Sequence, residues 1–138
     1  MTLSMSPTDL KLHRKTGILE LTYSDGGIYS LPAEFLRVHS PSAEVRGHGA
    51  GQEVLQTGKK SVKIDNIEPV GNYAVRLHFS DDHNTGIYSW EYLRDLCLNQ
   101  SSLWESYLAK MKQAGALRED LPKDVQVVNI MPLNDSID

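Results

Sequence analysis

The residues best suited to chemistry lie in a short polar stretch, 81–86, which reads Asp-Asp-His-Asn-Thr-Gly. Asp81, Asp82 and His83 bring together two carboxylates and an imidazole, which are good ligands for zinc or iron. The spacing matches neither a His-Glu-x-x-His motif nor an EF-hand loop. Asp, Asn and Gly are also the residues that a longer turn requires. Two interpretations therefore stay open, a plain turn and a metal site centred on His83.

A second polar stretch, 40–48, reads Ser-Pro-Ser-Ala-Glu-Val-Arg-Gly-His. Ser40 or Ser42 as nucleophile, His48 as base and Glu44 as orienting carboxylate would make a small hydrolase. No Gly-x-Ser-x-Gly elbow supports that chemistry, and the glycines that follow lack the Lys-Ser/Thr ending of a phosphate-binding loop. The surrounding glycine-rich segment, 39–51, has no hydrophobic period, which is typical of a binding loop or of disorder. We interpret it first as a binding loop.

Basic residues accompany this loop. They could steer an anionic partner, or they could be ordinary solvated surface. They are Arg37, Arg46, Lys59, Lys60 and Lys63. The whole chain has 14 Lys and Arg against 18 Asp and Glu, a net charge of -4, which argues against nucleic acid as a partner.

Composition bounds the class of protein. The 138 residues suit one domain with its own core, and 40% of them are hydrophobic. Cys97 is the single cysteine, so no internal disulfide can form, and the chain starts without an apolar signal stretch. We expect a cytoplasmic protein without a membrane segment, and we expect Cys97 to be a buried small hydrophobe.

The elements that must position these residues are repeated within the chain. Residues 24–37 and 80–94 share Ser, Asp, Gly, Ile, Tyr, Ser, Glu, Leu and Arg in the same order, and the second copy has an insertion containing His83. Each copy predicts a strand, a turn, a strand and a short helix. Two copies do not make a solenoid, so we expect one fused domain.

The remaining pattern completes an α+β fold, a small and mostly antiparallel sheet domain. Alternation predicts strands at 10–14, 18–23 and 28–31, and a hairpin of 62–70 with 73–79 around Gly71-Asn72. Helices are expected at 32–38, at 90–96 and at 101–115, the last with a Ser102/Glu105 capping box and Gly115 as its C-terminal cap. A strand is expected at 125–131. We predict a single domain over 9–132 between flexible ends, 1–8 and 133–138.

Two segments carry a family resemblance, 36–48, which reads Leu-Arg-Val-His-Ser-Pro-Ser-Ala-Glu-Val-Arg-Gly-His, and 79–90, which reads Phe-Ser-Asp-Asp-His-Asn-Thr-Gly-Ile-Tyr-Ser-Trp. Together with 51–59 and 68–74 they resemble the gamma-butyrobetaine hydroxylase-like N-terminal domain, over about 10–96. The resemblance implies a small, mostly β domain of unknown function. Such domains occur alone in bacteria, in carnitine-pathway oxygenases and attached to Mrp-type iron-sulfur carrier ATPases.

In the oxygenases, the resemblance implies a structural zinc held by Cys-x-Cys-x-x-Cys and one distant His. Those positions fall here on Ser40, Ser42, Val45 and His83. A Cys3His site is excluded, because valine cannot ligate and serine hydroxyls are poor zinc ligands. The mapping still predicts that the 40–48 loop lies beside His83. His48, Glu44, Asp81 or Asp82 would then complete a weaker site, or hydrogen bonds would replace the metal.

The leading functional hypothesis is a non-catalytic adaptor domain that binds a protein, with an Mrp-type iron-sulfur carrier as the suggested partner. We expect no cofactor, and zinc or iron only in the alternative metal-binding hypothesis. The second alternative is the small hydrolase. No oxygenase activity is expected, since the chain has no room for a double-stranded β-helix. The expected partner-binding residues are Ser40, Ser42, Glu44, Arg46, His48, Lys59 and Lys60.

Overall fold

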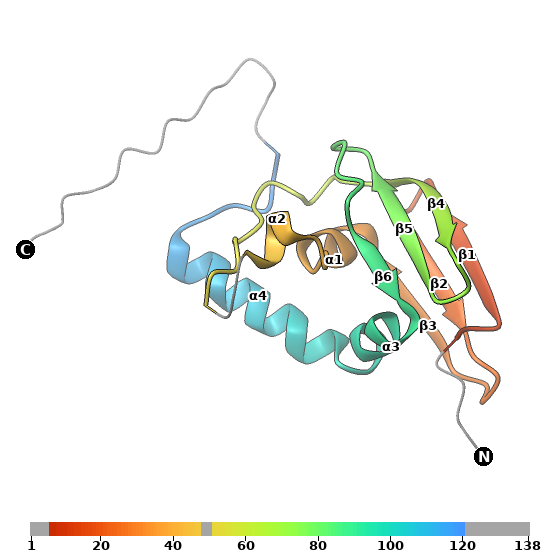
Figure 1. Cartoon of the computed structure of the whole chain (residues 1–138). Helices are drawn as coiled ribbons and strands as arrows, with labels where there is room; N and C mark the ends of the chain where they lie inside the picture. Colours follow the sequence, from red (N-terminus) through yellow and green to blue (C-terminus); the bar gives the residue numbers. More distant parts are fainter. Residues whose placement is uncertain (1–5, 48–50, 121–138) are drawn as a thin grey trace, which may run out of the picture.

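The computed structural model describes residues 6–47 and 51–120. Within these residues the chain forms two three-stranded antiparallel sheets and four helices (Figure 1). The first contains β1 (Asp9–His13), β2 (Ile18–Thr22) and β3 (Ile28–Pro32) in that order. The second contains β4 (Ile64–Val70), β5 (Ala74–Phe79) and β6 (Ile87–Ser89) in that order. The predicted α+β class with a mostly antiparallel sheet domain is confirmed, and its strands divide into two small sheets.

One hydrophobic core joins the two sheets. Leu19 and Leu21 of β2 and Leu77 of β5 are fully buried, while their neighbours along each strand are more exposed. This alternation is what a strand with one face on the core requires. The same core includes Tyr88 from β6 and Leu36 from the first helix. The sheets are therefore layers of one packed unit.

The helices of the described residues lie on one side of the sheets (Figure 1). They are α1 (Ala33–Val38), α2 (Ala43–Arg46), α3 (Trp90–Leu98) and α4 (Gln100–Ala114). The Ser89 hydroxyl accepts the backbone N–H of Tyr92 and so caps α3. Gly115 ends α4 with φ 63°, the left-handed conformation that favours glycine at this position.

The sequence repeat is a structural repeat. The unit β2-turn-β3-α1 recurs as β5-turn-β6-α3, which confirms the predicted duplication. The repeated Asp and Arg pair across the copies and not within them. Arg37 Nε donates to Asp81 Oδ2 at 2.9 Å, and Arg94 NH2 donates to Asp25 Oδ2 at 3.2 Å. Each copy thus supplies the ion-pair partner of the other.

Two local expectations change. The 39–51 loop contains a helical turn, α2, because the Ser42 hydroxyl accepts the Glu44 N–H as an N-terminal cap. The Ser102/Glu105 capping box is wrong. The helix α4 begins at Gln100, one residue after α3 ends, and Ser102 donates to the Asn99 carbonyl at 3.1 Å.

The strand expected at 125–131 and the flexible end at 133–138 lie outside the described residues. So does most of the flexible start predicted at 1–8, although Thr8 already donates its N–H to the Thr22 carbonyl at 2.7 Å. Cys97 is buried and free, as predicted. No helix in the described part of the chain is long and apolar enough to span a membrane.

Candidate functional site

The inserted turn between β5 and β6 places His83 inside the molecule. Asp82 takes a positive φ of 68°, which reverses the chain tightly enough for the Phe79 N–H to reach the His83 carbonyl at 2.9 Å. His83 is 7% exposed, whereas Asp82 beside it is exposed to solvent. The turn therefore directs its imidazole inward, toward the loop between α1 and α2.

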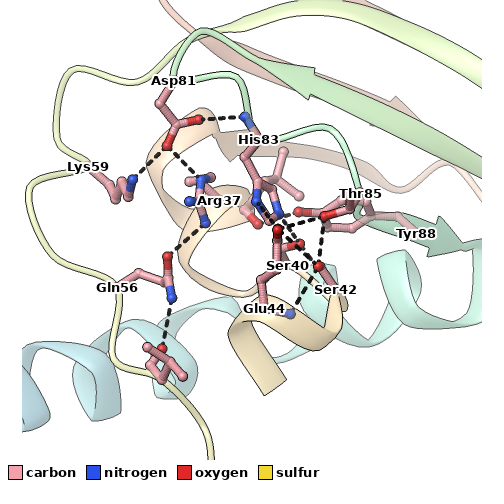
Figure 2. Close-up of polar contacts among 12 residues, drawn as sticks. Arg37, Ser40, Ser42, Glu44, Gln56, Lys59, Asp81, His83, Thr85 and Tyr88 are labelled. Carbon is pink, nitrogen blue, oxygen red and sulfur yellow. Dashed lines mark hydrogen bonds and ion pairs between the residues drawn. The ribbon is translucent and has the colours of Figure 1, made fainter. Parts of the chain in front are cut away.

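Residues from that loop enclose the imidazole (Figure 2). The Ser40 Oγ lies 2.8 Å from His83 Nε2, and a Glu44 Oε1 lies 3.2 Å from His83 Nδ1. The backbone N–H of Ser42 donates to the Ser40 Oγ at 3.3 Å. The resemblance predicted that this loop would lie beside His83, and the contact confirms it. A carboxylate next to Nδ1 favours a proton on Nδ1, which leaves Nε2 to accept from the Ser40 hydroxyl.

A second line of hydrogen bonds reinforces the same contact. Ser42 Oγ and Thr85 Oγ1 lie 2.8 Å apart, and Thr85 donates to Glu44 Oε1 at 2.8 Å. We call Ser40, Ser42, Glu44, His83 and Thr85 the polar cluster. Burial, helped by the charge of Arg37, lowers the pKa of His83 below its usual value, although Glu44 and Asp81 oppose the shift. The imidazole is therefore neutral near pH 7.

An ionic cluster of Arg37, Lys59 and Asp81 lies next to the polar cluster (Figure 2). Arg37 Nε lies 2.9 Å and Lys59 Nζ 2.6 Å from the same Asp81 oxygen, and Asp81 Oδ1 accepts the His83 N–H at 3.3 Å. Burial acts to raise the pKa of Asp81. The hydrogen bonds and charges of Lys59 and Arg37 outweigh it, and the pKa stays below its ordinary value. Arg37 NH1 also donates to Gln56 Oε1 at 2.9 Å, which attaches the 52–60 segment to α1.

The basic residues predicted as one strip are therefore divided by the fold. Arg37 and Lys59 are bound to Asp81, and Lys60 lies 3.5 Å from Glu119. The Arg46 guanidinium is exposed and lies 4.8 Å from the centre of the Tyr92 ring. His48 lies outside the described residues, so its predicted roles stay predictions.

The residues present do not fit the zinc site that the resemblance implies. Ser40 and Ser42 replace thiolates, and Val45 offers no ligand atom. Asp81 already forms ion pairs with two cationic side chains, Arg37 and Lys59. Within residues 6–47 and 51–120, no group of three or more His, Cys, Asp or Glu side chains could hold a metal ion. Hydrogen bonds occupy the place that a metal takes in the implied site.

The Ser40, His83 and Glu44 arrangement has the order of a catalytic triad, with His83 in the position that the sequence reasoning gave to His48. Its surroundings do not favour nucleophilic attack. Ser40 is 1% exposed, and a Cβ on Gly86 would come within 2.5 Å of the Ser40 Oγ. An acyl substrate needs room beside the nucleophile and donors for its oxyanion. In this geometry the neighbouring turn fills that room.

An open groove adjoins the polar cluster, and the sequence reasoning did not find it. Its volume is about 340 Å³, and its walls come from α1, α2, the 53–56 segment, α3 and α4. The side chains that form its floor and sides include Val38, His39, Val45, Leu55, Tyr92 and Tyr107. No sequence signal marks the groove, because its walls lie far apart in the chain and share no motif.

Together, these features define a class of protein, a small duplicated α+β domain in which a turn carrying a histidine closes on a short helical loop. Residues 10–94 match the family described as gamma-butyrobetaine hydroxylase-like, N-terminal. Because this match spans more than half of the sequence, the chain belongs to that family. The match is to the N-terminal domain, not to the oxygenase domain.

Solved structures agree with this assignment. Two protein structures determined by NMR in solution are 44% and 50% identical to this chain, with TM-scores of 0.74 and 0.72. The alignments cover 90% and 94% of this chain and 98% and 99% of those chains. A crystal structure of a DUF971-family protein of unknown function from Acidithiobacillus ferrooxidans is 40% identical, with a TM-score of 0.57. That alignment covers 67% of this chain and 92% of the other. A search of curated proteins found no match.

Proposed function

We propose that the protein is a non-catalytic adaptor domain that binds another protein through the face made by the α1–α2 loop, the 52–60 segment and the groove between them. One observation carries this proposal. The side chains best suited to chemistry, His83, Ser40 and Asp81, already have hydrogen-bond or ion-pair partners within the protein. The adjoining groove, by contrast, is open. Groups held in this way position a surface, and they are not free to act on a substrate.

The proposed partner is an Mrp-type iron-sulfur carrier ATPase. The support is the family resemblance, which implies that related domains are attached to such carriers. Attachment in one chain brings two modules to a high effective concentration, so an interface between them can be weak. A separate adaptor must bind through its own surface, and the groove face offers one.

The experiment is a calorimetric titration of the purified chain with the Mrp-type carrier from the same organism, in its cluster-free and cluster-loaded forms. We expect saturable binding to at least one form. Arg46→Glu, a change on the groove face, should weaken the binding. Lys112→Glu should not, because Lys112 lies outside the groove on the same helix as Lys110. The absence of heat and of co-elution with both forms would refute this partner.

The metal-binding hypothesis is separated by a second measurement. The chain is treated with a chelator and then titrated with zinc and with ferrous iron, while its amide NMR signals are followed. Saturable shifts confined to 40–47 and 81–86 that vanish in His83→Ala would replace the adaptor proposal with a metal-binding function. The adaptor proposal expects no saturable shift at stoichiometric metal.

A further inference from the structure

The groove has an apolar base that suits a hydrocarbon side chain. Val38 and Val45 are buried, with exposed fractions of 8% and 7%, and Leu55 and Leu103 are partly buried beside them. The volume of about 340 Å³ falls in the range of ligand-binding pockets, roughly 300–1,000 Å³. An occupant therefore gains from inserting at least one apolar side chain.

The rim of the groove is cationic. Arg46 and Lys110 both line it and are exposed, and neither has a carboxylate within ion-pair distance in the described part of the chain. Glu53 is the acidic residue among those that line the groove. Arg46 lies over the Tyr92 ring, which holds its guanidinium at the rim. Two cations with one carboxylate favour an occupant that carries acidic groups.

The groove wall also offers main-chain groups. The Val54 N–H donates to the Val45 carbonyl and the Gln56 carbonyl accepts from Tyr107 Oη, which hold the 54–56 segment in place. Within the described chain, the N–H and C=O groups of Leu55 have no hydrogen-bond partner. A ligand that carries backbone amides can pair with such groups, as peptides do when they lie along an open segment of chain.

His39, which also lines the groove, contributes a hydrogen-bond acceptor. Its Nδ1 lies 2.8 Å from the Phe35 carbonyl, which can only accept, so the Nδ1 carries the proton. Burial, with a smaller contribution from the charge of Lys110, lowers the pKa of His39, although the bond to Phe35 opposes the shift. His39 Nε2 is therefore a neutral acceptor among the groove residues, suited to a peptide N–H.

We propose that the groove binds a short acidic peptide segment of the partner, with one apolar side chain on the Val38 and Val45 base and a carboxylate at Arg46 and Lys110. This inference rests on the proposed adaptor function and specifies what the adaptor recognises. A nucleic acid is the poorer occupant, since two rim cations on a chain of net charge -4 neutralise few phosphates.

The test uses the full chain and three synthetic hexapeptides, followed by amide NMR titration. The probe is Asp-Val-Glu-Leu-Asp-Val. One control replaces each acidic residue with Lys, and the other replaces each apolar residue with Gly. We expect the probe alone to give saturable shifts, confined to residues around 38–46, 53–56 and 103–110. Arg46→Glu and Lys110→Glu should each weaken the binding about 1.5- to 5-fold, the range for one exposed charge pair, and Lys112→Glu should not.

Each result decides between the two proposals. Equal binding of all three peptides, no binding of the probe, or loss of binding in Lys112→Glu as large as in Lys110→Glu would overturn the peptide inference. Shifts in the same residues that depend on protein concentration without any peptide would show a second copy as the occupant, and would also overturn it. If the probe binds but the iron-sulfur carrier does not, the groove inference stands and the carrier is the wrong partner. If the carrier binds but the groove variants have no effect, the adaptor function stands and the peptide inference fails.

Discussion

Replacing Asp81 with asparagine tests whether the ionic cluster stabilises the contact between the two repeats. Asp81→Asn keeps the shape of the side chain and the oxygen that accepts the His83 N–H, but removes the negative charge shared by Arg37 and Lys59. The Arg37 side chain is only 8% exposed, so its guanidinium would stay buried without a counter-ion.

The structure sets the size of the effect. Removing one member of a buried ion pair costs about 3–5 kcal/mol of unfolding free energy. Asp81 itself is 21% exposed, so we expect the lower end, about 3 kcal/mol. For a domain of this length, that loss lowers the Tm by roughly 10 °C.

Asp25→Asn is the matched control. Asp25 is the repeat counterpart of Asp81 and pairs with Arg94, the counterpart of Arg37, but its side chain is 61% exposed. The control should leave the free energy of unfolding nearly unchanged, because solvent screens an exposed pair.

Urea unfolding, followed by the fluorescence of Trp90 and Trp104, measures all variants. Arg37→Met combined with Asp81→Asn should be less destabilised than Asp81→Asn alone, since the double variant removes the more deeply buried cation and leaves only Lys59, whose side chain is 20% exposed, without its counter-ion. Equal losses for Asp81→Asn and Asp25→Asn would refute the reasoning, because burial would then make no difference. A double variant less stable than either single variant would refute it as well.

Two further predictions concern the histidines and the implied zinc site. Because burial lowers the pKa of both His39 and His83, the unfolded chain binds more protons below pH 6.5, and stability is lost as the pH falls through that range. Urea titrations between pH 7.5 and 5 should show that the free energy of unfolding changes by up to about 1.4 kcal/mol per pH unit for each histidine, and by less in His83→Gln. A free energy of unfolding that does not change with pH would contradict the burial argument. The second prediction is that Ser40→Cys, Ser42→Cys and Val45→Cys made together should create a site for one zinc. Ser40 Oγ already lies 2.8 Å from His83 Nε2, and two ligands of one tetrahedral zinc lie about 3.5 Å apart. Zinc retained after gel filtration measures it, with the same triple variant carrying His83→Ala as the control, and equal retention in both would contradict the site.

Much of the fold could be predicted from the sequence, because strand alternation and turn residues are local signals. Gly71-Asn72 marked the hairpin of β4 and β5, and Gly115 marked the end of α4. The number of sheets could not be predicted, since alternation shows which face of a strand is buried but not which strands share hydrogen bonds. The helix expected at 101–115 is confirmed as α4, but its predicted cap was wrong, because Ser102 fits a cap in sequence whereas only Asn99 separates α4 from α3.

The candidate site was less predictable. The closeness of Ser40 to His83 came from the family resemblance, and no spacing rule pairs residues 43 positions apart. The ion pair of Arg37 with Asp81 and the walls of the groove depend on how the repeats pack, which is a property of the whole fold. The sequence could show which side chains are able to act as ligands, nucleophiles or bases. It could not show that contacts within the protein would occupy them.

The crossed ion pairs of the two repeats mean that neither half of the chain carries a complete set of its own partners. Arg37 meets Asp81 and Arg94 meets Asp25, so the bonds run as they would in a two-fold symmetric dimer of a half-length ancestor. Within one chain, the two repeats therefore exchange contacts in the way that the subunits of a symmetric dimer do. The difference that matters lies in the turn with the inserted residues, which places a histidine in the β-turn of the second half and has no counterpart in the first.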